Sequence, residues 1–437
     1  MNIFNINKKL LSLAEEIELS LKDQFQKIEK TANLNENKVL KAFLDCKIST
    51  TDFVESTGYG YGDSGREKLD KLFSNIFKSE DSLVRCGFVS GTHTIATALF
   101  SVLEKKDEML SVTSTPYPTI RKTIGIEKNK GSLKDIGVIY NEIDIFKNNK
   151  LDKNLLLENL KNKKIKMIYI QRSKGYCVRK SVSIKEIEEI ANLAHNINKD
   201  TIVFVDNCYG EFVEEKEPIE VGADLICGSL IKNPGGAIAK SGGYITGKKN
   251  LIELCAQKFT APGLGKEMGC NFNQNKDMFL GIFLAPMFVC NALKNSLFSR
   301  AIFKKLGFCV YPDVFEKTSD IVSIIELKSR EKLQSFCEGI QKNSPIDSFV
   351  TPTSSQMPGY ENEVIMACGS FINGASLELS ADCEVKPPYN VFLQGGISYN
   401  NAKIAILNTV EKMINEKQIE FWLYFFFNLC SFSNSIS

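Results

Sequence analysis

The decisive stretch of this sequence is Thr201-Ile-Val-Phe-Val-Asp206-Asn-Cys-Tyr-Gly210, in which a short apolar run leads directly into an aspartate. A run of this length that ends in a turn is typical of a buried strand of a parallel sheet. An aspartate at the tip of such a strand is costly to bury unless it has a partner. Asp206 is therefore either a residue that caps a helix or bonds to a loop, or an acid that pairs with a bound cation such as a pyridinium nitrogen. The stretch by itself leaves both open.

Short apolar runs alternate with helical patterns on both sides of this stretch. The expected strands are Leu83–Val89, Met109–Val112, Val138–Tyr140, Ile165–Ile170, Ile202–Val205 and Ala223–Cys227, with amphipathic segments such as Thr94–Leu103 and Ile184–Asn196 between them. Such alternation predicts βαβ units that build an α/β domain, with a mostly parallel sheet and helices on both faces. Ligands of these sheets bind beyond the carboxyl ends of the strands, so the residues that follow the strands form the candidate site.

We expect three regions along the chain. Residues 1–55 form an N-terminal helical segment, because the apolar residues from Leu10 to Ile28 fall on one helical stripe. Residues 56–285 carry the βαβ pattern. Residues 286–437 predict a smaller α+β domain with a Phe-rich tail that contains Phe421–Phe427. The elements expected in this last region are helices at 289–306, 331–343 and 400–417, and strands at 321–326, 364–367 and 376–379.

The composition argues against several classes of function. A net charge of +2 with scattered basic residues gives no general field for nucleic acid. Thirteen cysteines without a Cys-x-x-Cys pair, and only two histidines, give no metal-site spacing. The N-terminus lacks a signal-peptide pattern, and no run approaches the ~20 apolar residues of a membrane span. We therefore expect a cytoplasmic protein with free thiols that binds no metal, nucleic acid or membrane.

Two strand-to-loop junctions have the residues of a site for a phosphate and a planar ring. Ser90-Gly91-Thr92 precede an expected helix, whose N-terminal N–H groups suit an anion, although Ser and Thr there are more often plain caps. Tyr117 lies between two prolines that restrict its backbone, so it could stack on a ring or pack within its own loop.

A third junction, Gly228-Ser229-Leu-Ile-Lys232-Asn-Pro-Gly-Gly236, places a lysine at a bend after an expected strand. A lysine fixed there can be desolvated, which lowers its pKa and makes it nucleophilic. Ser229 could then reach the phosphate of a group bound to Lys232. Most lysines of this chain are solvated surface groups, and that alternative remains for position 232.

Arginine is rare here, with seven among 54 basic residues. Its planar donor fork suits phosphate and carboxylate, so the few arginines near expected strand ends are candidates for such ligands. These are Arg66, which ends a Gly/Tyr-rich segment, and Arg172 and Arg179, which flank a strand end.

Taken together, these stretches resemble the Cys/Met-metabolism enzymes that depend on pyridoxal 5′-phosphate, and more narrowly the branch called the methionine γ-lyase family or aluminium resistance protein. The resemblance covers roughly residues 55–410. It implies the type I, aspartate-aminotransferase-like fold. The matching stretches are 58–66 (GYGYGDSGR), 89–93 (VSGTH), 171–176 (QRSKGY), 205–212 (VDNCYGEF), 228–236 (GSLIKNPGG), 344–349, 357–360, 374–382 and 394–396.

The resemblance implies a role for each candidate residue. Lys232 would hold the cofactor as a Schiff base and act as the catalytic base, and Asp206 would pair with the ring nitrogen. Tyr117 would stack on the ring and assist proton transfers. The phosphate would be held by Ser90, Gly91, Thr92 and Ser229.

The resemblance also implies an assembly and a reaction. Tyr61 and Arg66 would reach the phosphate of a neighbouring subunit, so the active unit would be a homodimer or homotetramer with sites at the interface. The reaction would be β- or γ-elimination from a sulfur-containing amino acid, giving a thiol, a keto acid and ammonia. The alternatives are a transaminase or another amino-acid enzyme on the same fold, or a non-catalytic cofactor-binding protein. The sequence departs from the better-known lyases in lacking a matching C-terminal arginine for the substrate carboxylate, so Arg172 or Arg179 is expected to take that role.

Overall fold

The computed structural model describes residues 2–60, 62–161, 164–357 and 361–420. The chain divides into two compact units. Unit 2 comprises Thr31–Val289 and Thr318–Asp320, and unit 1 comprises the rest of the described chain. Tyr61 and the Phe-rich tail lie outside the described residues, so the expectations for them stay predictions.

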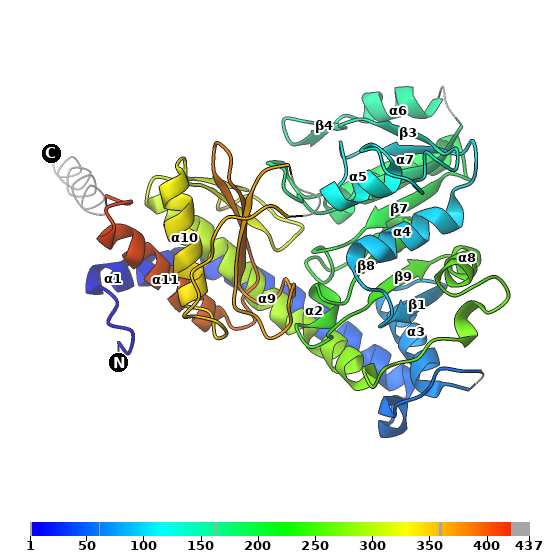
Figure 1. The fold of residues 1–437 in the computed structure, drawn as a ribbon, viewed down its shortest axis with the longest axis horizontal. Coiled ribbons are helices and arrows are strands. Elements are labelled where there is room, and N and C mark those ends of the chain that lie inside the picture. Colours follow the sequence, from blue (N-terminus) through cyan, green and yellow to red (C-terminus); the bar gives the residue numbers. More distant parts are fainter. Residues whose placement is uncertain (1, 61, 162–163, 358–360, 421–437) are drawn as a thin grey trace. The chain divides into compact units, whose positions relative to one another are not determined.

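Unit 2 is built on a seven-stranded sheet (Figure 1). Neighbouring strands from β8 to β3 run parallel, whereas β9 runs antiparallel to both of its neighbours, β1 and β8. This confirms the expected α/β class and the mostly parallel sheet. In spatial order the strands are β1 (Asp81–Arg85), β9 (Gly243–Gly247), β8 (Leu225–Ser229), β7 (Ile202–Asp206), β6 (Ile165–Gln171), β2 (Glu108–Ser111) and β3 (Ile139–Glu142). A separate hairpin pairs β4 (Phe146–Lys147) with β5 (Lys150–Leu151).

Helices cover both faces of this sheet, as the side chains of β9 demonstrate. The Tyr244 ring stacks on Phe77 of α3 (Ser64–Phe77) at a centroid distance of 5.0 Å. Its neighbour Ile245 points to the opposite face, because successive strand residues alternate. There it joins a buried cluster with residues of α4 (Gly91–Val102) and α8 (Lys249–Phe259). The remaining α-helices that lie wholly in unit 2 are α5 (Pro118–Ile124), α6 (Lys153–Lys161) and α7 (Ile184–Ile197).

Two long helices, α2 and α9, each contain residues of both units. The stripe expected at residues 10–28 is divided at Leu21 between α1 (Lys8–Ser20) and α2 (Lys22–Cys46). Helix α9 (Asn275–Lys305) begins before the expected Val289. By length and composition alone, α9 is long and apolar enough to span a membrane. The expectation that no segment comes near the length of a membrane span is therefore wrong. More than half of the most apolar window of α9 is buried within the protein, as in the core helix of a soluble protein.

Unit 1 contains a five-stranded antiparallel sheet and the whole of α1, α10 (Arg330–Lys342) and α11 (Tyr399–Asn415), which confirms the smaller α+β region. The strand order is β10 (Cys309–Tyr311), β11 (Ser323–Glu326), β14 (Asn390–Gln394), β13 (Ser380–Glu384) and β12 (Val364–Cys368). Its helices α10 and α11 pack with α1 and the sheet around one buried core.

One expected strand of unit 1 is wrong. Residues 376–379 form a loop, and the strand β13 begins after them at Ser380. The Glu378 carboxylate accepts hydrogen bonds from the backbone N–H groups of Phe371 and Ile372, and these bonds stabilise the loop.

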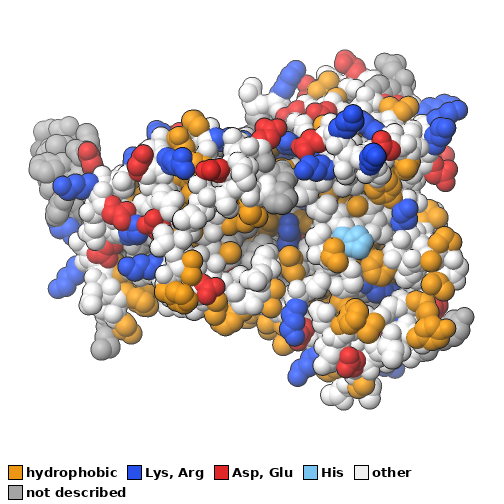
Figure 2. Space-filling model, in the orientation of Figure 1, with side chains coloured by type: hydrophobic (Ala, Val, Ile, Leu, Met, Phe, Trp, Pro, Cys, Tyr) orange, Lys and Arg blue, Asp and Glu red, His pale blue; other side chains and the backbone are white. Residues whose placement is uncertain are grey.

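On the face shown in Figure 2, acidic and basic side chains are interspersed.

Candidate functional site

Several predicted residues meet at the carboxyl ends of neighbouring strands. Asp206 ends β7 and pairs in register with Gln171, which ends β6, and with Cys227 of β8. Ser229 ends β8, and Lys232 follows it at the turn. Because β6, β7 and β8 run parallel, these residues share one edge of the sheet. This is the edge at which open α/β sheets bind their ligands.

The turn that follows β8 fixes Lys232. A Cβ at Gly235 would lie 1.4 Å from the Leu230 carbonyl oxygen, so only glycine allows the chain to fold back here. The Asn233 amide donates to the Glu211 carbonyl oxygen at 3.0 Å. The half-buried Lys232 ammonium lies 3.9 Å from the centroid of the Tyr209 ring. The surface alternative for this lysine is therefore wrong.

The charge state of Lys232 differs from the expectation. Burial by itself would lower the pKa of the amine, but the surrounding Tyr209, Cys208 and Asp206 raise it, and the net pKa lies above its usual value. The expected lowering of the Lys232 pKa is therefore wrong, because the charges of these three neighbours outweigh the effect of desolvation. The site holds an ammonium that must lose a proton before the nitrogen can act as a nucleophile.

Asp206 is buried, and its carboxyl interacts electrostatically with this ammonium. Burial raises the pKa of its carboxyl, and the Lys232 charge acts against that shift. The Cys208 backbone N–H also donates to the Asp206 carboxylate at 3.2 Å. The loop hydrogen bond that the sequence left open is therefore present, and the pairing of Asp206 with a pyridinium nitrogen stays a prediction.

The predicted anion site lies at the start of α4. A Cβ at Gly91 would lie 3.4 Å from the Ser229 Cβ, so the two junctions are in direct proximity. The Ser229 hydroxyl is buried, and no hydrogen-bond partner for it occurs among the described residues. Thr92 pairs with the Thr119 hydroxyl at 2.6 Å. The Ser90 hydroxyl caps α4 by accepting the His93 N–H at 3.1 Å. A helix N-terminus beside an unsatisfied hydroxyl can hold a phosphate.

Tyr117 stands at the edge of the same loop cluster. Its backbone N–H donates to the Gln171 side-chain oxygen at 2.7 Å. Its ring stacks on Tyr176 with centroids 5.7 Å apart and an interplanar angle of 28°. The packing alternative raised by the sequence is thus realised on one side of the ring.

The three candidate arginines have different surroundings. Arg172 is fully buried and bonds to Asn207 and Glu214, so its expected role as a substrate ligand is wrong: no solvent-facing molecule reaches it. Arg179 is half-buried and donates to the carbonyl oxygens of Gln171, at 2.9 Å, and of Ser173. Arg66 donates to two carbonyl oxygens of the Gly/Tyr-rich segment, each at 3.2 Å.

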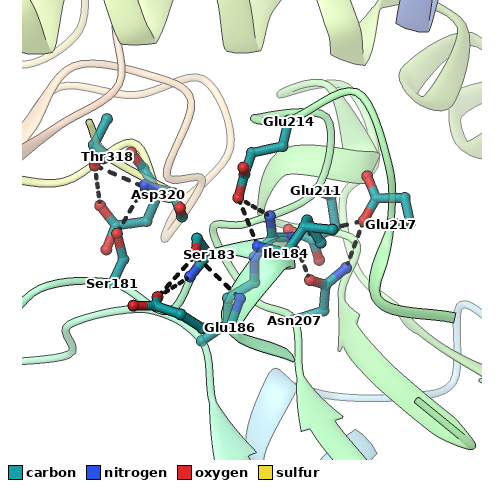
Figure 3. A network of polar contacts seen from close by, with 12 residues as sticks. Ser181, Ser183, Ile184, Glu186, Asn207, Glu211, Glu214, Glu217, Thr318 and Asp320 are labelled. Atoms are coloured by element: carbon teal, nitrogen blue, oxygen red, sulfur yellow. Dashed lines mark hydrogen bonds and ion pairs between the residues drawn. The ribbon is translucent and has the colours of Figure 1, made fainter. Parts of the chain in front are cut away.

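A polar network includes Asn207, Glu211 and Glu217, which are labelled in Figure 3. The Asn207 amide donates to the Glu217 carboxylate at 3.1 Å and to the Tyr244 hydroxyl at 3.3 Å, and that hydroxyl donates to Glu211 at 2.9 Å. Burial raises the pKa of Glu211 to about 8. This network therefore holds a carboxyl group that is protonated at neutral pH.

The sequence did not single out Tyr209 or Cys208. Tyr209 adopts the left-handed region with φ +70° and lies under the Lys232 ammonium. Cys208 is buried, and its sulfur would lie 3.7 Å from a Cβ at Gly91. The available signal was their position directly after the strand-end aspartate, since residues there face the ligand edge. Among the described residues, no cluster of three or more His, Cys, Asp or Glu side chains could hold a metal ion.

Comparison with known sequences gives a match along almost the whole chain. A family model described as methionine gamma-lyase matches residues 10–414. The uncharacterized protein YnbB of Bacillus subtilis is 45% identical over 412 residues, which cover 94% of this chain and 98% of that protein.

Solved structures agree with this match. A putative cystathionine beta-lyase involved in aluminum resistance from Clostridium acetobutylicum is 44% identical, with a TM-score of 0.90 over 94% of this chain and 97% of that chain. A pyridoxal-5′-phosphate-dependent protein of Escherichia coli, YhfS, is only 13% identical, yet it superimposes with a TM-score of 0.60 over 89% of this chain and 97% of that chain. The second likeness shows the fold alone.

Proposed function

Because the chain belongs to the methionine gamma-lyase family, we propose that it is a carbon–sulfur lyase that removes a thiol from a sulfur-containing amino acid by β- or γ-elimination. The family and the similar structures imply pyridoxal phosphate as the cofactor. The observation that carries the proposal is the meeting of Lys232, Asp206 and Ser229 at one sheet edge.

The described residues fit this cofactor. The Ser229 hydroxyl is buried without a partner beside Gly91 at the start of α4, which suits the phosphate. Asp206 is a buried acid, which suits a protonated ring nitrogen. Lys232 supplies the amine for covalent attachment. Ser90, Thr92 and Tyr117 border the same cluster and remain candidates for phosphate and ring contacts.

When bound, the cofactor supplies an electron sink for bond cleavage at the substrate α-carbon. The chain's residues hold it and move protons. Asp206 would hold a proton at the ring nitrogen, and the Lys232 amine would accept the α-proton of the substrate. The Lys232 nitrogen lies over the Tyr209 ring, and this cation–π contact helps to hold the nitrogen in place.

We assign the substrate carboxylate to Arg179. Of the two arginines proposed from the sequence, Arg172 is enclosed and Arg179 is half-buried. Its anchoring to the Gln171 and Ser173 carbonyl oxygens would orient the guanidinium from the same loop that carries Tyr176.

We also propose a homodimer, or a pair of dimers, in a reducing cytoplasm. Exposed apolar side chains on α2 and α9 of unit 2 support a buried contact with a second copy. All twelve cysteines of the described chain are free, as a reducing compartment favours. Tyr61 and Arg66 stay candidates for the neighbouring phosphate.

The test compares wild type with Lys232→Ala. Purified wild type should show a visible cofactor band and release thiol, keto acid and ammonia from cystathionine, cysteine or methionine. The variant should lose both. Amino-group transfer without thiol release would favour a transaminase, and a band that no amino acid perturbs would favour a non-catalytic binding protein.

A further inference from the structure

The turn that carries Asp206 and Tyr209 rests on a buried guanidinium. We propose that Arg172 is a positioning residue that holds the turn Asp206–Gly210, and with it the Asp206 carboxylate and the Tyr209 ring, in the geometry that the cofactor needs. The hold of Arg172 on this turn follows from contacts within the chain. Its link to the cofactor rests on the proposed function.

Arg172 contacts this turn through both its backbone and its side chain. Its backbone N–H donates to the Asp206 carbonyl oxygen at 3.1 Å. Its guanidinium donates to the Asn207 side-chain oxygen at 2.8 Å. One residue therefore fixes two consecutive positions at the end of β7, at the point where the chain leaves the sheet.

Gly210 shows how closely the turn lies on the guanidinium. A Cβ at this position would lie 2.5, 2.6 and 2.7 Å from three side-chain atoms of Arg172. The Gly210 N–H closes the turn by donating to the Asn207 carbonyl oxygen at 2.9 Å. The absence of a side chain at residue 210 thus lets the backbone rest directly on Arg172.

The backbone of the turn needs such support. Tyr209 and Phe212 both lie in the left-handed region, with φ of +70° and +63°. This region is unfavourable for residues with large side chains, and it persists only where the surroundings impose it. Arg172, with Asn207 between it and Glu217, provides a rigid base on one side of the turn.

The charge and the shape of the guanidinium explain why an arginine supports this turn. Glu214 lies 3.3 Å and Glu217 3.7 Å from the guanidinium nitrogens, and Ile184 donates its N–H to the same Glu214 oxygen (Figure 3). A planar fork of N–H donors can serve an amide and two carboxylates at once, whereas a lysine ammonium is a compact point charge without that fixed geometry. Arg172→Lys therefore keeps the charge and loses the shape.

The experiment measures amide exchange in the turn and the affinity of the protein for the cofactor. Hydrogen exchange of the amides at Cys208, Tyr209 and Gly210 is followed in the cofactor-free protein, and the dissociation constant for pyridoxal phosphate is measured by titration. The variants are Arg172→Lys and Arg172→Met. The control is Arg85→Lys, because Arg85 is also buried in unit 2 and bonds to Asp70 at 2.8 Å.

We expect Arg172→Lys to speed exchange at the three amides and to weaken cofactor binding by about tenfold, the usual effect of removing a residue that orients a ligand-binding group. Arg85→Lys should lower thermal stability without either local change. If Arg172→Met proves too unstable, Arg172→Lys still decides the question.

Unchanged exchange at these amides in Arg172→Lys would overturn the proposal, as would equal acceleration in Arg85→Lys. A wild-type protein that binds no cofactor would instead refute the proposed function, and the exchange measurement would still test the role of Arg172. Faster exchange with unchanged cofactor affinity would overturn the link between the turn and the ligand.

Discussion

Asp206 and Ser229 show how single residues at strand ends define a site. Each is buried at the ligand edge of the sheet, one as an acid and the other as an unsatisfied hydroxyl. Their residue types and spacing were readable from the sequence. The raised pKa of Lys232 was not, because it depends on Tyr209 and Cys208, whose orientation comes from the left-handed turn.

Glu211 gives a prediction about pH. Burial raises its pKa to about 8 from the usual 4.5, so the folded protein keeps it protonated while the unfolded chain ionises it. Its contribution to stability is therefore full below about pH 4.5 and is lost as the pH rises through about 8. Glu211→Gln should flatten this part of the stability–pH curve in urea unfolding. Parallel curves for variant and wild type would contradict the assignment.

Gly235 gives a prediction about the lysine turn. Gly235→Ala places a Cβ against the Leu230 carbonyl oxygen, which cannot yield without moving the backbone around Lys232. We expect a loss of about 1–3 kcal/mol in unfolding free energy and a weaker cofactor band. Gly131→Ala is the control, since nothing lies within 4 Å of a Cβ there, although φ is +78°. A Gly235→Ala protein that is as stable as the wild type would contradict this contact.

At the scale of elements, hydrophobic patterning predicted the parallel strands β6, β7 and β8 closely, because fully buried strands form continuous apolar runs. It missed β9, whose glycines at both ends weaken the strand signal, and it missed β10 and β14 of unit 1. It also took residues 376–379 for a strand. Local pattern cannot show that a side chain such as Glu378 will bond to backbone N–H groups in its own loop.

The contact between α10 and α11 gives a prediction at this scale. A Cβ at Gly339 would lie 2.6 Å from the Thr409 methyl group. Gly339→Ala should lower the unfolding free energy by about 1–3 kcal/mol through overpacking. Thr409→Ser removes that methyl group, so the double variant should recover part of the loss in a double-mutant cycle. Strict additivity of the two changes would contradict the direct contact.

At the scale of the whole molecule, the exposed apolar side chains of unit 2 form the surface through which we expect two copies of the chain to associate. Leu40 and Leu44 are exposed on α2, and Phe283 and Met287 are exposed on α9. The Phe43 ring of α2 meets Phe283 edge-on at a centroid distance of 5.4 Å, so the two helices share one surface. Sequence patterning could not show which apolar side chains of these helices stay exposed, because exposure depends on the folded neighbours.

Assembly is tested by placing a charge on this surface. Leu44→Glu, combined with Phe283→Glu, should convert the dimer to monomers in sedimentation experiments, because charges buried without partners at an interface are unfavourable. Lys317→Glu, a charge change in unit 1, serves as the control and should leave the assembly intact. A wild-type monomer, or a double variant that still dimerises, would contradict the proposed surface.

The covalent link at Lys232 is tested most directly by reducing the cofactor-loaded protein with borohydride and mapping the modified peptide by mass spectrometry. We expect one phosphopyridoxyl group per chain, on Lys232. Attachment to a different lysine, or no attachment in protein loaded with pyridoxal phosphate, would contradict it.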